Sequence, residues 1–339
     1  MNPTPTAAAP RPRSKLVYWL VALALAGVFL YYSLRGIDWL QVWITLKSTR
    51  LKYLALMLIS GTGSLFLRAM RWRVLLQSGG PVGVGTAFWA TCAGYFGNNY
   101  LPARAGELVR TVMVDRETGL GRMFVLTTAL AERLSDAITL VLLSSLVLLT
   151  LATRPGWYGA AAKPFAIAGI CGAVGIAVFP RLERLWKYLM ARAPLPERLR
   201  EKVTGILEQI LAGLRAFHDV RRLALFAGLT CVIWSIDAVS FIMGGLSVGL
   251  SLTLPMSVLL ISGLGLGSAL PSTPGYVGIY QFVAVEVLMP FGFSRSSVIA
   301  FMVLVQAVQY GSLGIWGLLA LSRFQKDKKA MDMSTVDIK

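Results

Sequence analysis

Long apolar blocks, each separated from the next by a short basic stretch, constrain this chain more than any other feature of its sequence. Of its 339 residues, 56% are hydrophobic and only 14% are charged, whereas about 25% of the residues in a typical soluble domain are charged. A block of about 20 apolar residues is long enough to cross a bilayer as a helix. The pattern therefore predicts an all-α, polytopic membrane protein.

We expect about six full transmembrane helices, at about 16–35, 52–72, 122–152, 164–180, 222–248 and 295–321. Two further apolar stretches, about 82–118 and about 256–289, are rich in glycine and interrupted by proline. Backbone that leaves the helix within a membrane has to be covered by protein or water. These two stretches are therefore expected to be re-entrant hairpins, each made of two half-helices.

The remaining segments are polar. Residues 1–15 are expected to be a disordered cytoplasmic N-terminus, 181–222 a cytoplasmic amphipathic segment of two surface helices, and 322–339 a cytoplasmic tail. With both termini in the cytoplasm, most of the 33 Lys and Arg residues fall on the cytoplasmic side, as the positive-inside rule requires. We therefore expect a multi-pass protein of the bacterial cytoplasmic (inner) membrane. Its net charge of +17 indicates contact with anionic headgroups, and no nucleic-acid partner is expected.

The two interrupted stretches share a short sequence. Residues 101–107 read LPARAGE and residues 270–276 read LPSTPGY, so Leu, Pro and Gly coincide at an offset of 169 residues. Each half of the chain also contains two spans, one hairpin and one span, in that order. This order predicts an inverted-topology repeat, with halves at 16–152 and 163–321 and discontinuous helices that meet near the bilayer midplane.

Polar residues surround the first interruption. Pro102 ends the inward half-helix because it lacks an amide proton, and the next half-helix begins near Ala105. The free N–H groups of a helix N-terminus bind anions, and a guanidinium fits phosphate. We therefore expect a lipid-phosphate site that comprises Asn98, Asn99, Arg104, Gly106, Glu107 and Arg110. The structural alternative is a tight turn in which the asparagines satisfy backbone groups.

The second interruption offers a matching site. Residues 272–274 read STP, and Ser or Thr followed by Pro is a helix-start signal. A second helix N-terminus would then point inward from the opposite face. The candidate binding residues are Ser272, Thr273, Gly275 and Gly278, and the helix breaks are Pro271 and Pro274 together with Pro102. A purely structural turn explains this pattern equally well.

Charged residues also occur inside predicted spans, where each costs about 2.5–3.5 kcal/mol to insert. They are Glu132, Arg133 and Asp136 in one span and Asp237 in another. Arg133 reaches Asp136 at i, i+3 on a helix, and Asp237 is expected to partner Arg133 or Arg104. Two acids with one base leave a surplus carboxylate near the middle of the membrane. That carboxylate is a candidate for proton coupling.

Three arginines, Arg68, Arg71 and Arg73, end the 52–72 span beside Trp72. Arginine and tryptophan at a span end are typical of interfacial anchoring, and we expect headgroup contact there as a secondary role. The sequence has no metal-ligand spacing, no phosphate-binding loop and no catalytic motif. We therefore predict no metal, no cofactor and no catalytic residue.

Four stretches together resemble the lysylphosphatidylglycerol synthase transmembrane (flippase-like domain) family, which includes YbhN-like proteins and the membrane half of MprF. They read RAMRWRVLL at 68–76, NNYLPARAGELVR at 98–110, ERLSD at 132–136 and PSTPGYVG at 271–278. The resemblance implies a lipid-translocating domain of inverted repeats. The family-like positions are Asn98, Arg104, Glu107, Arg110, Glu132, Arg133, Asp136, Pro271, Pro274, Gly275 and Gly278.

Two residues, Tyr276 and Gln281, depart from the pattern of many relatives, so the substrate is expected to differ. The soluble synthase domain of MprF is expected to be absent, and synthesis of a lysylated lipid is not implied.

The sequence favours a transporter, not an enzyme, that moves an anionic phospholipid or a polyprenyl-phosphate-linked lipid between leaflets. One alternative is a membrane-embedded transferase of a lipid-linked sugar pathway, which the lack of a DxD pair disfavours. Another is a non-transporting accessory subunit, which the intramembrane charges disfavour. Membrane lipids are the expected partners. A second copy of the chain and a lipid-pathway enzyme are the candidate protein partners.

Overall fold

The structure is a computed structural model, and it describes residues 24, 27–101, 105–150, 156–192, 196–268 and 274–336. In these ranges the chain forms helices and no strand. Three of the described helices are long and apolar enough to cross a membrane, namely α3 (Leu51–Leu76), α10 (Val220–Ser247) and the part of α13 up to Gln325. The prediction of an all-α, polytopic membrane protein is confirmed.

The first half contains one helix interruption. Residues 27–34 are helical, and the helices that follow are α2 (Trp39–Lys47), α3, α4 (Val84–Tyr100), α5 (Gly106–Thr118) and α6 (Arg122–Thr150). Asp38 caps α2 by accepting hydrogen bonds from the amides of Leu40 and Gln41. The expected break between half-helices falls between α4 and α5. Pro102 and Arg104 lie outside the described residues.

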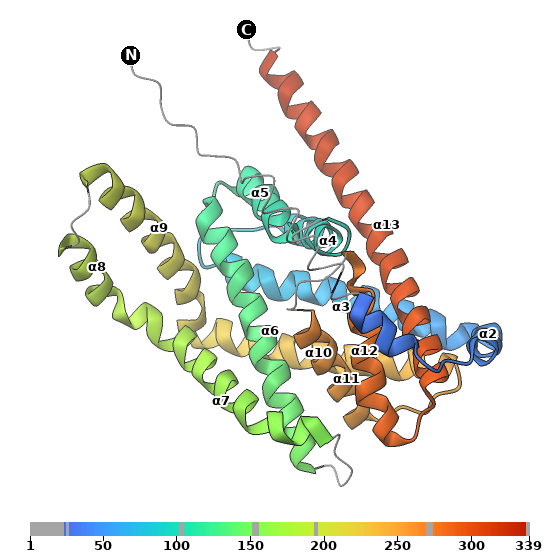
Figure 1. The fold of residues 1–339 in the computed structure, drawn as a ribbon. Coiled ribbons are helices and arrows are strands. Elements are labelled where there is room, and N and C mark those ends of the chain that lie inside the picture. Colours follow the sequence, from blue (N-terminus) through green and yellow to red (C-terminus); the bar gives the residue numbers. More distant parts are fainter. Residues whose placement is uncertain are drawn as a thin grey trace.

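Two short helices follow α7 (Gly156–Val178) within the second half. They are α8 (Glu183–Arg192) and α9 (Glu197–Arg215), and they correspond to the two helices expected within 181–222. The chain folds back between them, so that α9 packs against α6 (Figure 1). Their position at the membrane surface stays a prediction.

The second half continues with α10, α11 (Leu254–Gly267), α12 (Ile279–Leu288) and α13 (Arg295–Val336). The outward half-helix was expected to begin at the STP sequence, residues 272–274. The structure describes Pro274 of this sequence, and the half-helix does not begin there. Pro274–Tyr276 form a 3-10 turn, and α12 begins only after Gly278. Gly275 and Gly278 have φ values of 81° and 90°, which glycine adopts without steric cost. Pro271, Ser272 and Thr273 lie outside the described residues.

The last helix is longer than the predicted last span. α13 continues as a helix through the first part of the segment expected to be the cytoplasmic tail, and it ends at Val336. In Figure 1 its C-terminal part extends away from the other helices.

The two halves pack against each other in a reciprocal pattern (Figure 1). α3 of the first half lies along α10 of the second. α4 packs on α13, and in the same way α11 packs on α6. Two equivalent units that exchange places about a twofold axis make contacts of this kind. The opposite orientation of the halves in a membrane, with re-entrant hairpins, stays a prediction.

Candidate functional site

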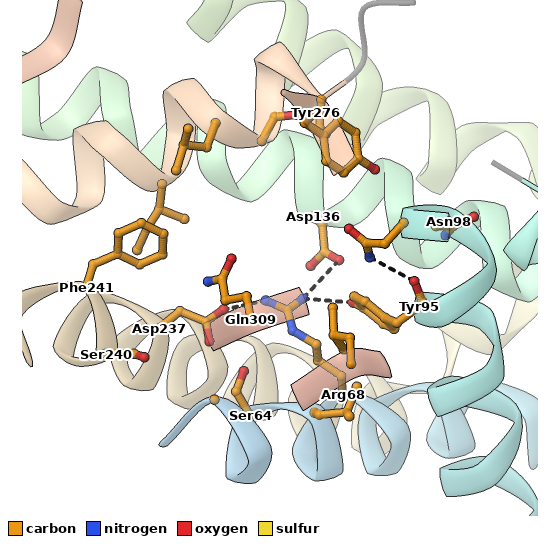
Figure 2. Close-up of a pocket in the computed structure, with 18 of the residues that line it drawn as sticks. Ser64, Arg68, Tyr95, Asn98, Asp136, Asp237, Ser240, Phe241, Tyr276 and Gln309 are labelled. Atoms are coloured by element: carbon orange, nitrogen blue, oxygen red, sulfur yellow. Dashed lines mark hydrogen bonds and ion pairs between the residues drawn. The ribbon is translucent and has the colours of Figure 1, made fainter. Parts of the chain in front are cut away.

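A cavity of about 550 Å³ lies between the two halves and is bordered by residues of α3, α4, α5, α6, α10, α11, α12 and α13. Its polar lining includes Arg68, Tyr95, Asn98, Asn99, Glu107, Arg133, Asp136, Asp237 and Gln309. Its apolar lining includes Met57, Leu58, Leu140, Phe241, Ile261 and Leu264. Figure 2 shows Phe241 on the opposite side of the cavity from Tyr95 and Asn98. The cavity therefore has the mixed character that an amphipathic ligand requires.

Arg71 is the most enclosed member of a charge network beside this cavity. Its side chain is 0% exposed; Nη1 donates to Asp136 at 2.6 Å and Nη2 donates to Glu132 at 2.9 Å. Nη1 also donates to the hydroxyl of Thr230 on α10 at 3.2 Å. The expectation that Arg71 anchors the span at the interface is wrong, because α6 and α10 cover this part of α3.

Arg110 holds the other side of Glu132. Its Nη1 donates to Oε2 of Glu132 at 2.9 Å, its Nη2 donates to the carbonyl of Ala129 at 3.1 Å, and it also pairs with Glu107. The Arg110 side chain is 1% exposed, and its guanidinium lies 4.4 Å from the centre of the Trp72 ring. Arg110 is thus buried in the protein and does not line the cavity where a lipid phosphate was expected to contact it.

Arg133 does not form the expected i, i+3 ion pair with Asp136. Its Nε donates to Glu107 at 2.9 Å, and its Nη1 donates to the hydroxyl of Tyr95 at 3.0 Å. The Arg133 side chain remains 32% exposed and lines the cavity. Of the network arginines, it is the most accessible to a ligand.

Arg68 and Asp237 meet across the interface between α3 and α10. Nη2 of Arg68 pairs with Asp237, and Nη1 lies 3.7 Å from Asp136 and 3.3 Å from the Tyr95 hydroxyl. Figure 2 shows these contacts converging on Arg68. Asp237 was expected to partner Arg133 or Arg104, and within the described residues its ion pair is instead with Arg68. Arg68 is therefore a cavity residue and not an interfacial anchor.

The network is electrically balanced in the part of the chain that the structure describes. It joins Arg68, Arg71, Arg110 and Arg133 to Glu107, Glu132, Asp136 and Asp237. The surplus carboxylate expected within 132–136 is therefore not present, because Arg71 and Arg110 neutralise these acids from other helices. Pairing of this kind is what charges within a membrane require.

The asparagines of the first hairpin line the cavity but already have protein partners. Nδ2 of Asn98 donates to Glu107 at 3.0 Å, and Nδ2 of Asn99 donates to the carbonyl of Tyr95 at 2.8 Å. Asn99 thus satisfies a backbone group, as the structural alternative expects. Gly106 has a packing role, because a Cβ there would lie 1.8 Å from the carbonyl oxygen of Gly94.

Neutral amides hold the second hairpin. The side chain of Gln281 accepts from the amide of Gly278 at 2.8 Å and donates to Gln306 on α13. Gln306 in turn donates to the carbonyl of Gly275 at 3.1 Å. Gly275 and Gly278 are therefore held by these contacts, and their expected role in lipid binding stays a prediction.

Arg73 differs from the other two arginines of its span. Its Nε donates to the carbonyl of Val82 at 2.6 Å, which holds the end of α3 to the segment before α4. Headgroup contact by Arg73 stays a prediction.

Several cavity residues were missed by the sequence analysis. They are Tyr95, Trp234, Tyr280, Gln309 and Tyr310. Gln306, Gln309 and Tyr310 lie at i, i+3 and i+4 in an otherwise apolar span, so they share one face of the helix. That polar stripe is the signal that would have found Gln309 and Tyr310.

The helical fold and the charged cavity define a multi-pass membrane protein. The chain belongs to the lysylphosphatidylglycerol synthase TM region family, whose model matches residues 19–317. The chain is also 27% identical, over 254 residues, to the glycosyltransferase AglD of Haloferax volcanii. That match covers 66% of this chain and only 40% of the length of the relative. The family and this relative support a membrane protein of lipid pathways.

Proposed function

We propose that this protein moves an anionic lipid, either a phospholipid or a polyprenyl-phosphate-linked lipid, between the two leaflets without changing it chemically. The observation that carries the proposal is the cavity between the halves, which combines accessible arginines with an apolar wall. A headgroup that crosses hydrocarbon alone loses its hydration at a high free-energy cost. Polar side chains along the path reduce that cost, while the acyl chains stay in the surrounding lipid.

The position of the cavity also supports transport. Transporters built from repeats hold substrate at the repeat interface, on discontinuous helices. Here both interrupted pairs, α4 with α5 and α11 with α12, contribute cavity residues. The Arg68–Asp237 contact joins the two halves at this point. A change in how the halves pack would therefore alter access to the cavity.

A second candidate function is transfer of a sugar to or from a lipid carrier, because a relative bears the name of a glycosyltransferase. The geometry offers this function less support. The cavity carboxylates Glu107, Asp136 and Asp237 are each paired with arginine. A general acid or base has to reach the proton that it transfers to or from the substrate, whereas these three carboxylates are held by arginine side chains.

The test is reconstitution of the purified protein into liposomes that carry headgroup-labelled phosphatidylglycerol in both leaflets. An impermeant quencher reports the label that reaches the outer leaflet. We expect quenching to pass beyond the outer-leaflet fraction only when the protein is present, and the mass spectrum of the recovered lipid to be unchanged. Quenching that stops at the level of protein-free liposomes, for both phosphatidylglycerol and a polyprenyl phosphate, would refute transport. A glycosylated product in the presence of sugar donors would favour the transferase.

A further inference from the structure

We propose that Tyr95, together with Arg68 and Arg133, forms the site that recognises the phosphate group of the lipid. This inference rests on the proposed transport and adds to it the atoms that select the substrate. These three residues come from α4, α3 and α6, and all of them line the cavity.

The hydroxyl of Tyr95 lies between the two guanidinium groups. It accepts a hydrogen bond from Nη1 of Arg133 at 3.0 Å and another from Nη1 of Arg68 at 3.3 Å. The same ring lies 4.6 Å from Cζ of Arg133 and 5.9 Å from Cζ of Arg68, measured to the ring centre. One phenol therefore holds two cations from different helices close to a single point.

The contacts of this hydroxyl leave its proton unused. A phenol has one O–H donor, and its oxygen is otherwise an acceptor. Both contacts of the Tyr95 hydroxyl use it as an acceptor, and within the described ranges no protein group accepts its proton. Because Tyr95 lines the cavity, the natural acceptor is an oxygen atom of a ligand in the cavity.

Arg133 offers a second unused donor. Its Nε and Nη1 have protein partners, whereas within the described part of the chain its Nη2 has none. The side chain is also 32% exposed. A phosphate brings several acceptor oxygens and a negative charge, so it can accept from both donors and compete with Glu107 for the guanidinium of Arg133. A neutral hydroxyl headgroup would match the donors alone.

The acids of the network make this binding reversible. Glu107 is paired with Arg133, and Asp237 is paired with Arg68. An arriving phosphate therefore competes with these carboxylates for the same guanidinium groups. When the phosphate leaves, the carboxylates restore the ion pairs. A transporter requires this exchange, because a site that holds its substrate too tightly does not release it.

The test measures equilibrium binding to the purified full chain in detergent, with phosphatidylglycerol and with diacylglycerol of the same acyl chains. The variant is Tyr95→Phe, which removes one hydroxyl and keeps the ring. The matched control is Tyr53→Phe on α3, because Tyr53 does not line the cavity. We expect wild type to prefer phosphatidylglycerol and Tyr95→Phe to weaken that binding about tenfold. Binding of diacylglycerol and all binding by Tyr53→Phe are expected to stay unchanged.

Two results would overturn the site: wild type binding both lipids equally, or Tyr95→Phe binding phosphatidylglycerol as wild type does. Either result would overturn the phosphate site whether or not the liposomes show transport. Conversely, a lost transport signal with an intact Tyr95-dependent phosphate preference would refute the proposed function and leave the site standing. If Tyr95→Phe does not fold, Arg133→Lys replaces it, because it keeps the charge and loses the fork of donors. Competition by inorganic phosphate separates a site for any phosphate from one for a lipid phosphate.

Discussion

Arg68 of α3 and Asp237 of α10 form an ion pair, and they lie 169 residues apart in the chain. The same offset separates Leu51 from Val220, the first residues of those two helices. It is also the offset between the LPARAGE and LPSTPGY sequences. The ion pair thus joins equivalent positions of the two halves, one of which carries a base and the other an acid. At this equivalent position the two halves carry opposite charges, and the attraction between these charges helps to hold the halves together.

This relationship predicts the outcome of a charge exchange. Arg68→Asp or Asp237→Arg alone places like charges together and is expected to lower the free energy of unfolding by about 3 kcal/mol or more. The double variant is expected to recover part of that loss. Recovery is incomplete because Asp136 lies 3.7 Å from Arg68. In the double variant, Asp136 faces an acid at position 68 where it had faced an arginine. Thermal unfolding in one detergent measures all three, and a double variant no more stable than the worse single variant would contradict the pairing.

Arg71 is expected to be the arginine on which stability depends most. Arg71→Ala leaves Asp136 without its closest cation and Glu132 with only Arg110, and the loss of one partner from a buried pair costs about 3–5 kcal/mol. Arg122→Ala is the control, because Arg122 pairs with Asp115 but is 67% exposed, and such pairs contribute about 1 kcal/mol or less. Equal melting temperatures for the two variants would show that the network does not stabilise the fold.

The close approach of α4 and α5 depends on Gly106. Gly106→Ala places a methyl group against the carbonyl of Gly94, at a distance that no Cβ tolerates, so the half-helices have to separate. We expect a lower yield of folded protein and a loss of stability above about 1 kcal/mol. Gly63→Ala on α3, which meets no atom within 4 Å, is expected to be neutral or slightly stabilising. If both variants behave alike in size-exclusion chromatography and thermal unfolding, the packing role of Gly106 is refuted.

The amide pair of the second hairpin is expected to show the asymmetry of buried hydrogen bonds. Gln306→Leu leaves the side chain of Gln281 and the carbonyl of Gly275 without this partner, at a cost of about 1–3 kcal/mol. Adding Gln281→Leu removes one of the groups that were left unpaired. The double variant should therefore lose less stability than the sum of the single variants, as measured in a double-mutant cycle. Strict additivity would argue against the pair.

The helices and their breaks were predictable because they depend on local sequence. Apolar blocks gave α3, α6 and α10 close to their observed bounds, and they gave the start of α13. The break near Pro102 was placed between α4 and α5, since glycine, asparagine and proline act on neighbouring residues. The start of α12 was missed by a few residues because the positive φ values of Gly275 and Gly278 turn the chain beyond Pro274.

The charge network was not predictable in the same way, because its ion pairs join distant helices. Sequence neighbours suggested that Arg133 pairs with Asp136, whereas Arg71 takes that place from 65 residues away. The position of Arg71 near the end of a span indicated an interface, and only the packing of α6 and α10 shows that it is buried. Tyr95 was missed because an isolated tyrosine in an apolar stretch has no distinctive pattern.

The measurement that most directly tests transport through the cavity compares Gly61→Leu with Gly63→Leu in the liposome assay. Both glycines lie on α3, and a Cβ added at either would meet no atom within 4 Å, but only Gly61 lines the cavity. A leucine at either position should therefore fold, and only the one at Gly61 fills the proposed path. We predict that Gly63→Leu transports labelled phosphatidylglycerol as wild type does, while Gly61→Leu falls to the rate of protein-free liposomes. Equal rates for both variants would contradict transport through this cavity.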